Sequence, residues 1–324
     1  MTEAPTVSVL VTTYNHVNFV RECLDSLLSQ TFRDFEVIIT DDASSDGTAD
    51  RIAAWLSAHA LPARFLRNET NRGLCANRNT ALALARGRFI CSLSGDDAYE
   101  PERLERQVAC FMREPPDVAL VYSDMRRVDA AGRDLGASFI ETELGDEPPP
   151  EGDVFGRLMR GCFVPSPAAM VRKSAFDSVG PYDESLFYED FDMWLRLGHR
   201  YRLRYLPDRL VRYRVLADSM SHSLGLRPKL LESTARILQG WEGRSAAAEP
   251  DRLWHLARIQ LLLGRDREAR ETLARAARAT PGFWRHMLVW ALHLPGVCAI
   301  ARRVARARHV ARHATRPALL GRPA

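Results

Sequence analysis

The chain has 324 residues, of which 46% are hydrophobic and 27% are charged, so it can bury a core and is not an intrinsically disordered protein. Its net charge is only +4, and residues 272–324 carry ten arginines and no carboxylate, so the rest of the chain is net negative. Six cysteines without a CxxC pair argue against a disulfide scaffold, a zinc ribbon and a thioredoxin-type site. We therefore expect reduced thiols in a cytoplasmic protein that has no secretion signal.

The first 125 residues alternate strand and helix patterns, as expected of a mostly parallel sheet flanked by helices. Residues 7–13 form an unbroken apolar run that predicts a buried strand, and Asn18 is positioned to cap the helix after it. Further strands are predicted at 35–40, 63–68, 89–93 and 118–123. The helices between these strands are expected to run through Ile52, over 74–85 with Gly87 closing it, and onward from Pro101.

Beyond residue 130 the pattern is less regular. Residues 131–152 are predicted to form a loop, because glycines and a run of three prolines interrupt every period. The elements expected next are a helix at 154–159, an extended stretch at 163–171, an amphipathic helix at 189–197, and short strands within 201–215 that turn at Pro207 and Asp208. From residue 226 the sequence becomes an arginine- and alanine-rich helix. We therefore expect one domain over 1–225 and a helical extension over 226–324.

The helical extension has two notable features. Residues 254–277 predict a helix pair of the tetratricopeptide type, which must dock on another surface because one such unit is not stable alone. Residues 283–300 are apolar, but Arg285 and Pro295 interrupt them, so this segment is too short to span a bilayer. Together with the basic residues after it, the segment fits an interfacial helix on an anionic membrane. A domain-packing helix with a solvated tail fits the same pattern.

Three of the first four predicted strands deliver polar residues at their carboxyl ends, where ligands bind in an open α/β sheet. These residues are Thr12 to Asn15, Asp41 with Asp42, and Asp96 with Asp97. The glycine-rich dinucleotide and P-loop fingerprints are absent after the first strand, so a phosphate ligand needs another neutralising group. A divalent cation held by the Asp96/Asp97 pair would supply it, because adjacent carboxylates suit Mg²⁺ or Mn²⁺ with a diphosphate completing the coordination. A solvated helix-capping turn is the structural alternative.

Four sequence blocks then occur in a fixed order. They are VSVLVTTYNHVNFVRECLDSLLSQTFRDFEVIITDDASSDGT, NRGLCANRNTALALARGRFICSLSGDDAYEPERL, VGPYDESLFYEDFDMWLRLG and RYRVLADSMS. In this order they resemble the opening, metal-binding, acceptor-side and closing segments of family 2 glycosyltransferases, which have the nucleotide-sugar-binding GT-A fold. The resemblance covers residues 6–222. It implies a Rossmann-like, mostly parallel α/β sheet in an enzyme that moves a sugar from a nucleotide diphosphate sugar.

The resemblance implies roles for residues at the donor. Thr12 and Tyr14 would line the nucleobase pocket, and Asp42 would hydrogen-bond the base. A helix-capping carboxylate is the alternative for Asp42. Arg72 and Arg78 stand where family members place a basic residue near the diphosphate, and either could instead be a surface arginine.

The resemblance also implies a metal site. Asp96 and Asp97 would share the ribose and the metal, either Mg²⁺ or Mn²⁺. Ser94 stands where many family members have the first Asp of the DxD motif. One carboxylate fewer implies a weaker metal site or a shift of the metal ligand to Asp97, and leaves open which of the two aspartates binds the cation.

Asp190 is the predicted catalytic base, with Glu189 beside it. An inverting transfer needs one carboxylate to take the proton of the acceptor hydroxyl while that oxygen attacks the anomeric carbon. Two neighbouring carboxylates can hold their pKa values apart, and on a helix only one of them can face the sugar. The structural alternative is an acidic first helix turn, which the helix dipole favours.

The resemblance thus implies an inverting, metal-dependent glycosyltransferase that builds a bacterial surface glycan or glycolipid at the inner face of the cell membrane. Ser94, together with Leu216 where the family often has a histidine, motivates an alternative: a catalytically silent module that binds a nucleotide sugar or a glycan. A second alternative is an interaction protein whose basic tail docks on a membrane or on nucleic acid. Of these two partners we expect the membrane.

Overall fold

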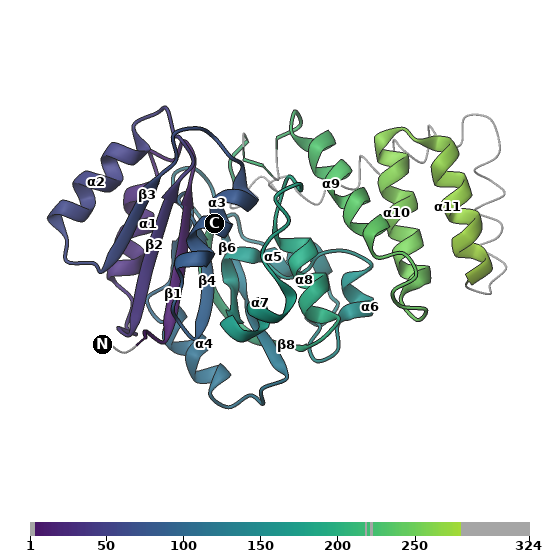
Figure 1. The fold of residues 1–324 in the computed structure, drawn as a ribbon, viewed down its shortest axis with the longest axis horizontal. Coiled ribbons are helices and arrows are strands. Elements are labelled where there is room, and N and C mark those ends of the chain that lie inside the picture. The colour runs from purple at the N-terminus through teal and green to yellow at the C-terminus, as the bar shows by residue number, and fades with distance from the viewer. Residues whose placement is uncertain (1–3, 218, 221–222, 280–324) are drawn as a thin grey trace, which may run out of the picture. The chain divides into compact units, whose positions relative to one another are not determined.

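The computed structural model describes residues 4–217, 219–220 and 223–279 (Figure 1). They form two compact units. The first contains the described residues up to Asp153 together with Phe163–Leu216, and the second contains Val154–Cys162 and the described residues from Ala217 onward. The sequence did not indicate that 154–162 would join the second unit, and the predicted domain boundary at 225/226 stays a prediction. The predicted interfacial segment and most of the basic tail lie outside the described residues.

An eight-stranded sheet with the order β3-β2-β1-β4-β7-β6-β8-β5 forms the centre of the first unit. The strands are β1 Val7–Thr13, β2 Phe35–Asp41, β3 Ala63–Arg67, β4 Phe89–Ser94, β5 Ala98–Tyr99, β6 Val118–Val128, β7 Ala169–Arg172 and β8 Arg202–Arg214. Strands β1 to β4 pair in parallel, whereas β7 runs antiparallel to both β4 and β6. The predicted α/β fold with a mostly parallel sheet is thereby confirmed.

Helices flank the sheet, and several of them bury one apolar face against it. Those of the first unit are α1 Val20–Leu28, α2 Thr48–Ala58, α3 Leu74–Leu84, α4 Arg103–Phe111, α5 Phe139–Leu144, α7 Lys173–Val179 and α8 Asp190–Gly198, with a short 3₁₀ turn, η1, at Ser166–Ala168. Leu24 and Leu27 of α1 and Ile52 of α2 are buried in one hydrophobic core with Val9 and Val37 of the sheet. Burying this apolar surface is the main force that holds helices and sheet together.

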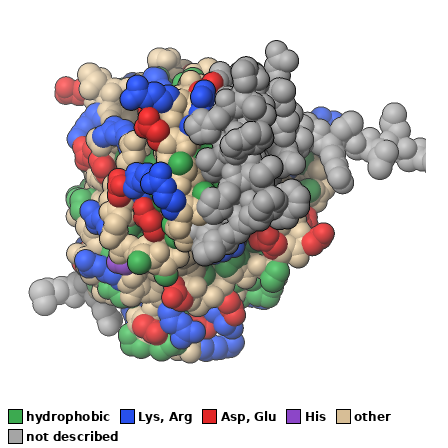
Figure 2. All heavy atoms as spheres, turned by 90° about the vertical axis from the view of Figure 1, so that its right-hand side faces the viewer, with side chains coloured by type: hydrophobic (Ala, Val, Ile, Leu, Met, Phe, Trp, Pro, Cys, Tyr) green, Lys and Arg blue, Asp and Glu red, His purple; other side chains and the backbone are tan. Residues whose placement is uncertain are grey.

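The second unit consists of α6 Phe155–Leu158, α9 Arg227–Gly240, α10 Glu249–Leu263 and α11 Asp266–Ala279. Helices α10 and α11 form the predicted pair, and Gly264 makes the turn between them in the left-handed conformation (φ 81°). Ion pairs such as Arg265–Glu232 join this unit's helices, and Figure 2 shows basic and acidic side chains interspersed on one face of the molecule. Within the described residues, no helix has both the length and the apolar character that crossing a membrane requires.

Two predicted helix starts are wrong. Helix α1 begins after Phe19 without any side-chain cap, so Asn18 is not the cap. The turn before α1 supplies the first hydrogen bonds instead, because the backbone N–H of Val20 donates to the carbonyl oxygen of His16 at 2.9 Å. Helix α4 begins at Arg103 rather than at Pro101, which lies in the turn ahead of it.

The region after β6 also differs from the prediction. Strand β8 is continuous instead of turning at Pro207 and Asp208, because its register with β6 shifts there and leaves these two residues outside the pairing. Helix α5 lies within the predicted loop at 131–152. A reciprocal capping box formed by Ser138 and Glu141 stabilises its first turn.

Gly87 does not close α3 as predicted. The helix ends at Leu84, and Ala85 is already extended (φ −71°, ψ 127°). Gly87 instead lies directly against β1: a Cβ atom built on it would be 2.4 Å from the backbone nitrogen of Ser8. Its N–H also donates to Ser8 Oγ at 2.8 Å. The glycine therefore allows the chain to enter β4 in close contact with β1.

We predict that Gly87→Ala lowers the free energy of unfolding by about 1–3 kcal/mol, since the added methyl group would overlap the backbone of β1. Urea unfolding of the full chain measures this change. Gly240→Ala is the control, because a Cβ there meets no atom within 4 Å, and its effect should stay within about 1 kcal/mol. Equal effects of the two substitutions would contradict the close approach.

Candidate active site

The carboxyl ends of β1, β2 and β4 meet at one edge of the sheet. Thr12 of β1 pairs with Thr40 on one side and with Ser94 on the other. Beyond Ser94, the backbone N–H of Gly95 donates to the carbonyl oxygen of Thr12 at 3.0 Å. A Cβ on Gly95 would lie 2.6 Å from Thr13 Cγ2 and 2.8 Å from His16 Nδ1, so a larger residue there would have to displace these side chains. This contact joins the turn that carries the predicted metal ligands to β1.

The carboxylate of Asp42 holds the start of α3. Its Oδ1 accepts hydrogen bonds from the backbone N–H of Arg72 at 2.8 Å and from the side-chain amide of Asn68 at 2.8 Å. Its Oδ2 accepts from the backbone N–H of Gly73 at 2.9 Å. Asp42 is 4% exposed, and a negative charge at a helix N-terminus is favourable. Both backbone donors precede the first residue of the helix, so Asp42 holds the turn that leads into α3, and contact with a nucleobase stays a prediction.

A cavity of about 470 Å³ lies beside Asp42, lined by Ala43, Ser44, Arg67, Asn68 and Glu69. The predicted nucleobase residues flank the same sheet edge: Thr12 is buried at the end of β1, and Tyr14, in the loop after it, is 49% exposed. Arg72 is an exposed side chain whose Nη1 lies 3.5 Å from Thr80 Oγ1. Sequence reasoning did not single out Asn68. Its position directly after β3, next to a carboxylate at the end of β2, is the signal that could have identified it.

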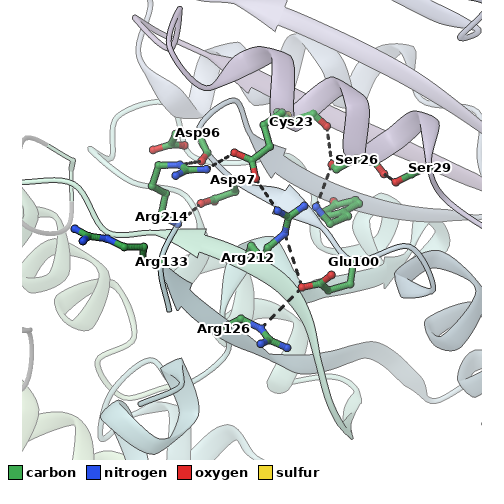
Figure 3. A network of polar contacts seen from close by, with 12 residues as sticks. Cys23, Ser26, Ser29, Asp96, Asp97, Glu100, Arg126, Arg133, Arg212 and Arg214 are labelled. Carbon is green, nitrogen blue, oxygen red and sulfur yellow. Dashed lines mark hydrogen bonds and ion pairs between the residues drawn. The ribbon is translucent and has the colours of Figure 1, made fainter. Parts of the chain in front are cut away.

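Asp96 and Asp97 form the turn between β4 and β5, and Arg214 of β8 holds this turn (Figure 3). The backbone N–H of Arg214 donates to Asp97 Oδ1 at 2.9 Å, and its Nε donates to the carbonyl oxygen of Asp96 at 2.9 Å. Its Nη1 donates to two loop carbonyl groups after β6, and its Nη2 contacts Glu22 Oε2 of α1 at 2.5 Å. Arg214 is 3% exposed and connects β8 to the β4–β5 turn, to the loop after β6 and to α1. This residue was not identified from the sequence.

The two aspartates of this turn differ in accessibility. Burial, and then the neighbouring charge of Asp96, raise the pKa of Asp97 well above its ordinary value, and this residue is 3% exposed. The Asp96 side chain is 13% exposed, and its Oδ1 lies 3.8 Å from His16 Nε2. Among the described residues no group of three or more metal-ligating side chains occurs. Asp96 nevertheless suits Mg²⁺ or Mn²⁺, because such ions bind through one or two carboxylates plus substrate phosphates.

Glu189 and Asp190 stand at the start of α8. Arg78 Nη1 of α3 donates to Glu189 Oε1 at 2.5 Å, and the two side chains are 5% and 6% exposed. Ser166 Oγ of η1 lies 2.9 Å from the same Arg78 nitrogen and 3.0 Å from the same Glu189 oxygen. Arg78 is thus a buried arginine, and the alternative of a surface arginine is wrong for this residue. Its contact with a diphosphate stays a prediction.

The Asp190 carboxylate has no side-chain hydrogen-bond partner within the described part of the chain. Burial and the neighbouring Glu189 raise the pKa of Asp190 to about 7, although Arg78 acts to lower it. Arg78 also acts, as the smallest of the named causes, to lower the pKa of Asp97, although burial and Asp96 raise that pKa overall. A carboxyl group that titrates near neutral pH is suited to taking a proton from a substrate hydroxyl.

Comparison with known proteins identifies relatives of this arrangement. The family model described as Glycosyl transferase family 2 matches residues 8–180. An uncharacterised glycosyltransferase of Methanocaldococcus jannaschii is 30% identical over 220 residues, which cover 66% of this chain and 72% of that protein. The Escherichia coli UDP-Glc:alpha-D-GlcNAc-diphosphoundecaprenol beta-1,3-glucosyltransferase WfaP is 28% identical over 219 residues, which cover 66% of this chain and 79% of WfaP.

Solved structures share the fold. S. aureus TarS 1–349 in complex with UDP-GlcNAc superposes with a TM-score of 0.62 at 20% identity, covering 95% of this chain and 89% of that one. The mannosyltransferase PcManGT from Pyrobaculum calidifontis, in complex with GDP-Man and Mn²⁺, gives a TM-score of 0.60 at 18% identity and covers 96% and 88%. The GT-A fold that the sequence resemblance implies is therefore confirmed.

We predict that Arg214→Met lowers the free energy of unfolding by about 3 kcal/mol, because several buried carbonyl groups lose their donor. Urea unfolding of the full chain measures the loss. Arg212→Met is a matched control on the same strand: Arg212 also pairs with Glu22, but its side chain is 35% exposed, so we expect a loss of at most about 1 kcal/mol. Similar small losses in both variants would show that Arg214 does not hold the turn.

Proposed function

The chain belongs to glycosyl transferase family 2, and from that premise we propose that it is an inverting, metal-dependent enzyme acting on a glycan or lipid-linked acceptor. A nucleotide sugar donor is supported by the UDP-GlcNAc and GDP-Man bound to the solved neighbours. The name of WfaP, which specifies a diphosphoundecaprenol-linked sugar, supports a role in surface polysaccharide synthesis. The observation that carries the proposal is Asp190, a carboxyl group with a raised pKa and no side-chain partner among the described residues, next to the buried ion pair of Arg78 and Glu189.

In this proposal the donor binds at the edge formed by β1, β2 and β4. The nucleobase occupies the cavity beside Asp42, which the residues after β3 line on one side. Thr12 at the end of β1 and Tyr14 in the loop after it contact the base from the other side. Because Asp42 already accepts hydrogen bonds from the start of α3, it both orients that helix and faces the base with its remaining lone pairs. Arg72 is exposed and long enough to reach a diphosphate near the same helix end.

Asp96 is the proposed protein ligand of the cation, with the donor diphosphate supplying further oxygen ligands. Asp97 is more deeply buried and accepts the backbone N–H of Arg214, so its carboxylate shapes the turn. The Mn²⁺ in the structure of PcManGT supports a divalent metal. When bound, such an ion supplies positive charge that offsets the charge developing on the departing diphosphate.

Asp190 is the proposed base. The acceptor hydroxyl oxygen forms a bond to the anomeric carbon, the bond from that carbon to the diphosphate oxygen breaks, and its electron pair leaves with the nucleotide diphosphate. The hydroxyl proton passes to the Asp190 carboxylate. Attack from the face opposite the diphosphate inverts the anomeric configuration. Glu189 does not compete for this proton in our proposal, because its Oε1 already accepts hydrogen bonds from Arg78 and Ser166.

We further propose that the enzyme works in the cytoplasm, peripherally at the inner face of the cell membrane. A lipid-linked acceptor would lie in that membrane, and the arginine-rich sequence after residue 272 is suited to an anionic surface. This part of the proposal rests on sequence alone, since nearly all of that segment is outside the described residues.

We predict that Asp190→Asn lowers kcat at least about 10²-fold while nucleotide binding is retained, because the amide cannot accept the proton. Release of UDP or GDP in a screen of donors and acceptors with Mn²⁺ or Mg²⁺ measures turnover, and calorimetry with the nucleotide measures binding. Asp192→Asn is the matched control on the same helix, since Asp192 contacts Arg196 at 2.8 Å and should change kcat only a few-fold.

Two outcomes would contradict the proposal. Full activity of Asp190→Asn would overturn the assignment of the base. A wild-type protein that binds nucleotide sugars in the presence of metal, yet turns over none of the donors, would instead be the silent binding module of the same fold.

We also predict that kcat/KM falls as the pH drops through about 7, since the rise in the pKa of Asp190 means that its carboxyl group becomes protonated there. A protonated carboxyl group cannot act as a base, so the rate should fall about tenfold per pH unit below that value. A pH–rate profile with the best donor checks this. A rate that is flat between about pH 5 and pH 7 would exclude a base with a raised pKa.

A further inference from the structure

Three polar side chains that are far apart in the sequence meet next to Asp190. Arg78 comes from α3, Ser166 from η1 and Glu189 from the residue before α8. The distances within this triad are 2.5 Å from Arg78 Nη1 to Glu189 Oε1, 2.9 Å from Arg78 Nη1 to Ser166 Oγ, and 3.0 Å from Ser166 Oγ to Glu189 Oε1. A charged pair this deeply buried costs free energy to desolvate, and breaking it leaves one uncompensated charge. Its presence beside the proposed base therefore needs a reason.

Helix α3 also holds the segment that leads to Asp190. The side-chain amide of Asn79 donates to the carbonyl oxygen of Tyr182 at 2.9 Å, and the backbone N–H of Tyr182 donates back to Asn79 Oδ1 at 2.9 Å. Cys75 Sγ lies 3.5 Å from the carbonyl oxygen of Leu186. Positions 75, 78 and 79 share one face of α3, so a single helix face fixes the backbone from residue 182 to residue 189.

The charges around Asp190 are few. Glu189 is adjacent to it in the chain, and Arg78 faces it from α3. On α8 itself, Asp192 is turned to Arg196, with 2.8 Å between Oδ2 and Nε. Other titratable groups near Arg78 and Cys75 are Tyr182 and Asp183 of the preceding segment, Asp97 of the β4–β5 turn and Tyr99 of β5. After burial, which has the largest effect, Glu189 and Arg78 are the two charges that most affect the pKa of Asp190, and they act in opposite directions.

We propose that Arg78, Ser166 and Glu189 are positioning residues that hold Asp190 toward the acceptor and set the pH at which it can take a proton. This inference rests on the proposed role of Asp190 as the base. It gives Arg78 a role through Glu189 in place of the contact with the diphosphate that the family resemblance implies. It also explains why an acidic residue precedes the base: Arg78 and Ser166 hydrogen-bond to Glu189, whereas Asp190 has no side-chain hydrogen-bond partner among the described residues.

The test compares pH profiles of kcat/KM for the full-length protein. Glu189→Gln removes a negative charge next to Asp190 and leaves Arg78, so the acidic limb should move to lower pH by about one unit. Arg78→Gln removes the positive charge and should move the limb to higher pH. Ser166→Ala should lower kcat more than it changes the KM of the donor, since the triad orients the base and does not contact the donor.

Conservative and remote variants serve as controls. Arg78→Lys keeps the positive charge, so the acidic limb of its pH profile should lie close to that of the wild type. If Arg78→Gln does not fold, Arg78→Lys and Glu189→Gln still test the inference. Arg64→Gln removes an arginine of β3 that is 44% exposed and lies 3.7 Å from Glu36, so it should leave the limb unchanged. Calorimetry with UDP and Mn²⁺ confirms that each variant retains a folded donor site.

The failure of this inference differs from the failure of the proposed function. If Asp190→Asn is inactive but the limb stays in place in both Glu189→Gln and Arg78→Gln, or moves the same way in both, the triad does not tune the base and this inference is overturned. If Glu189→Gln is inactive while Asp190→Asn is active, Glu189 is itself the base, and both proposals fail.

Discussion

A buried carboxylate must be hydrogen-bonded or paired, and this constraint shapes the edge of the sheet where the donor is proposed to bind. Four acidic residues of the candidate site are nearly inaccessible: Asp41, Asp42, Asp97 and Glu189, with exposures of 0%, 4%, 3% and 6%. Each has its own donors. The hydroxyl groups of Thr13 and Ser44 donate hydrogen bonds to Asp41, and the backbone just before α3 donates to Asp42. The backbone N–H of Arg214 donates to Asp97, and the Arg78 guanidinium donates to Glu189. The need to place these donors therefore constrains the conformation of the loops that carry them.

Helix α3 connects the two halves of the site because it satisfies carboxylates at two places. The N–H groups just before its first turn bind Asp42 at the end of β2, and Arg78 on its second turn binds Glu189 at the start of α8. Between them, Asn77 donates to the carbonyl oxygen of Thr40 at 3.2 Å and accepts from Asn68. A single rigid helix thereby relates the proposed donor cavity to the proposed base.

Most of the strands and the acidic residues at their ends could be predicted from sequence, because both depend on local periodicity. The parallel block β1 to β4 follows from apolar runs, and a polar residue after such a run must lie at the sheet edge. The partners could not be predicted in the same way. Arg78 and Glu189 are 111 residues apart, Arg214 and Asp97 are 117 apart, and nothing in the local spacing of an arginine says which carboxylate it will meet. The continuity of β8 past Pro207 was missed for the same reason, since a bulge depends on the neighbouring strand.

In the two acidic pairs, Asp96–Asp97 and Glu189–Asp190, one member is held by the rest of the chain and the other is more accessible. In each pair one carboxylate is fixed by an arginine from a distant element, Asp97 by the backbone of Arg214 and Glu189 by the side chain of Arg78. Its neighbour, Asp96 or Asp190, is left partly accessible. Since Asp97 and Glu189 are each held by other parts of the chain, the second acid of each pair can serve as an anchor for the backbone that presents the first. At the second pair, the fixed member Glu189 also places a negative charge beside the accessible one, and this charge makes a proton at Asp190 easier to bind.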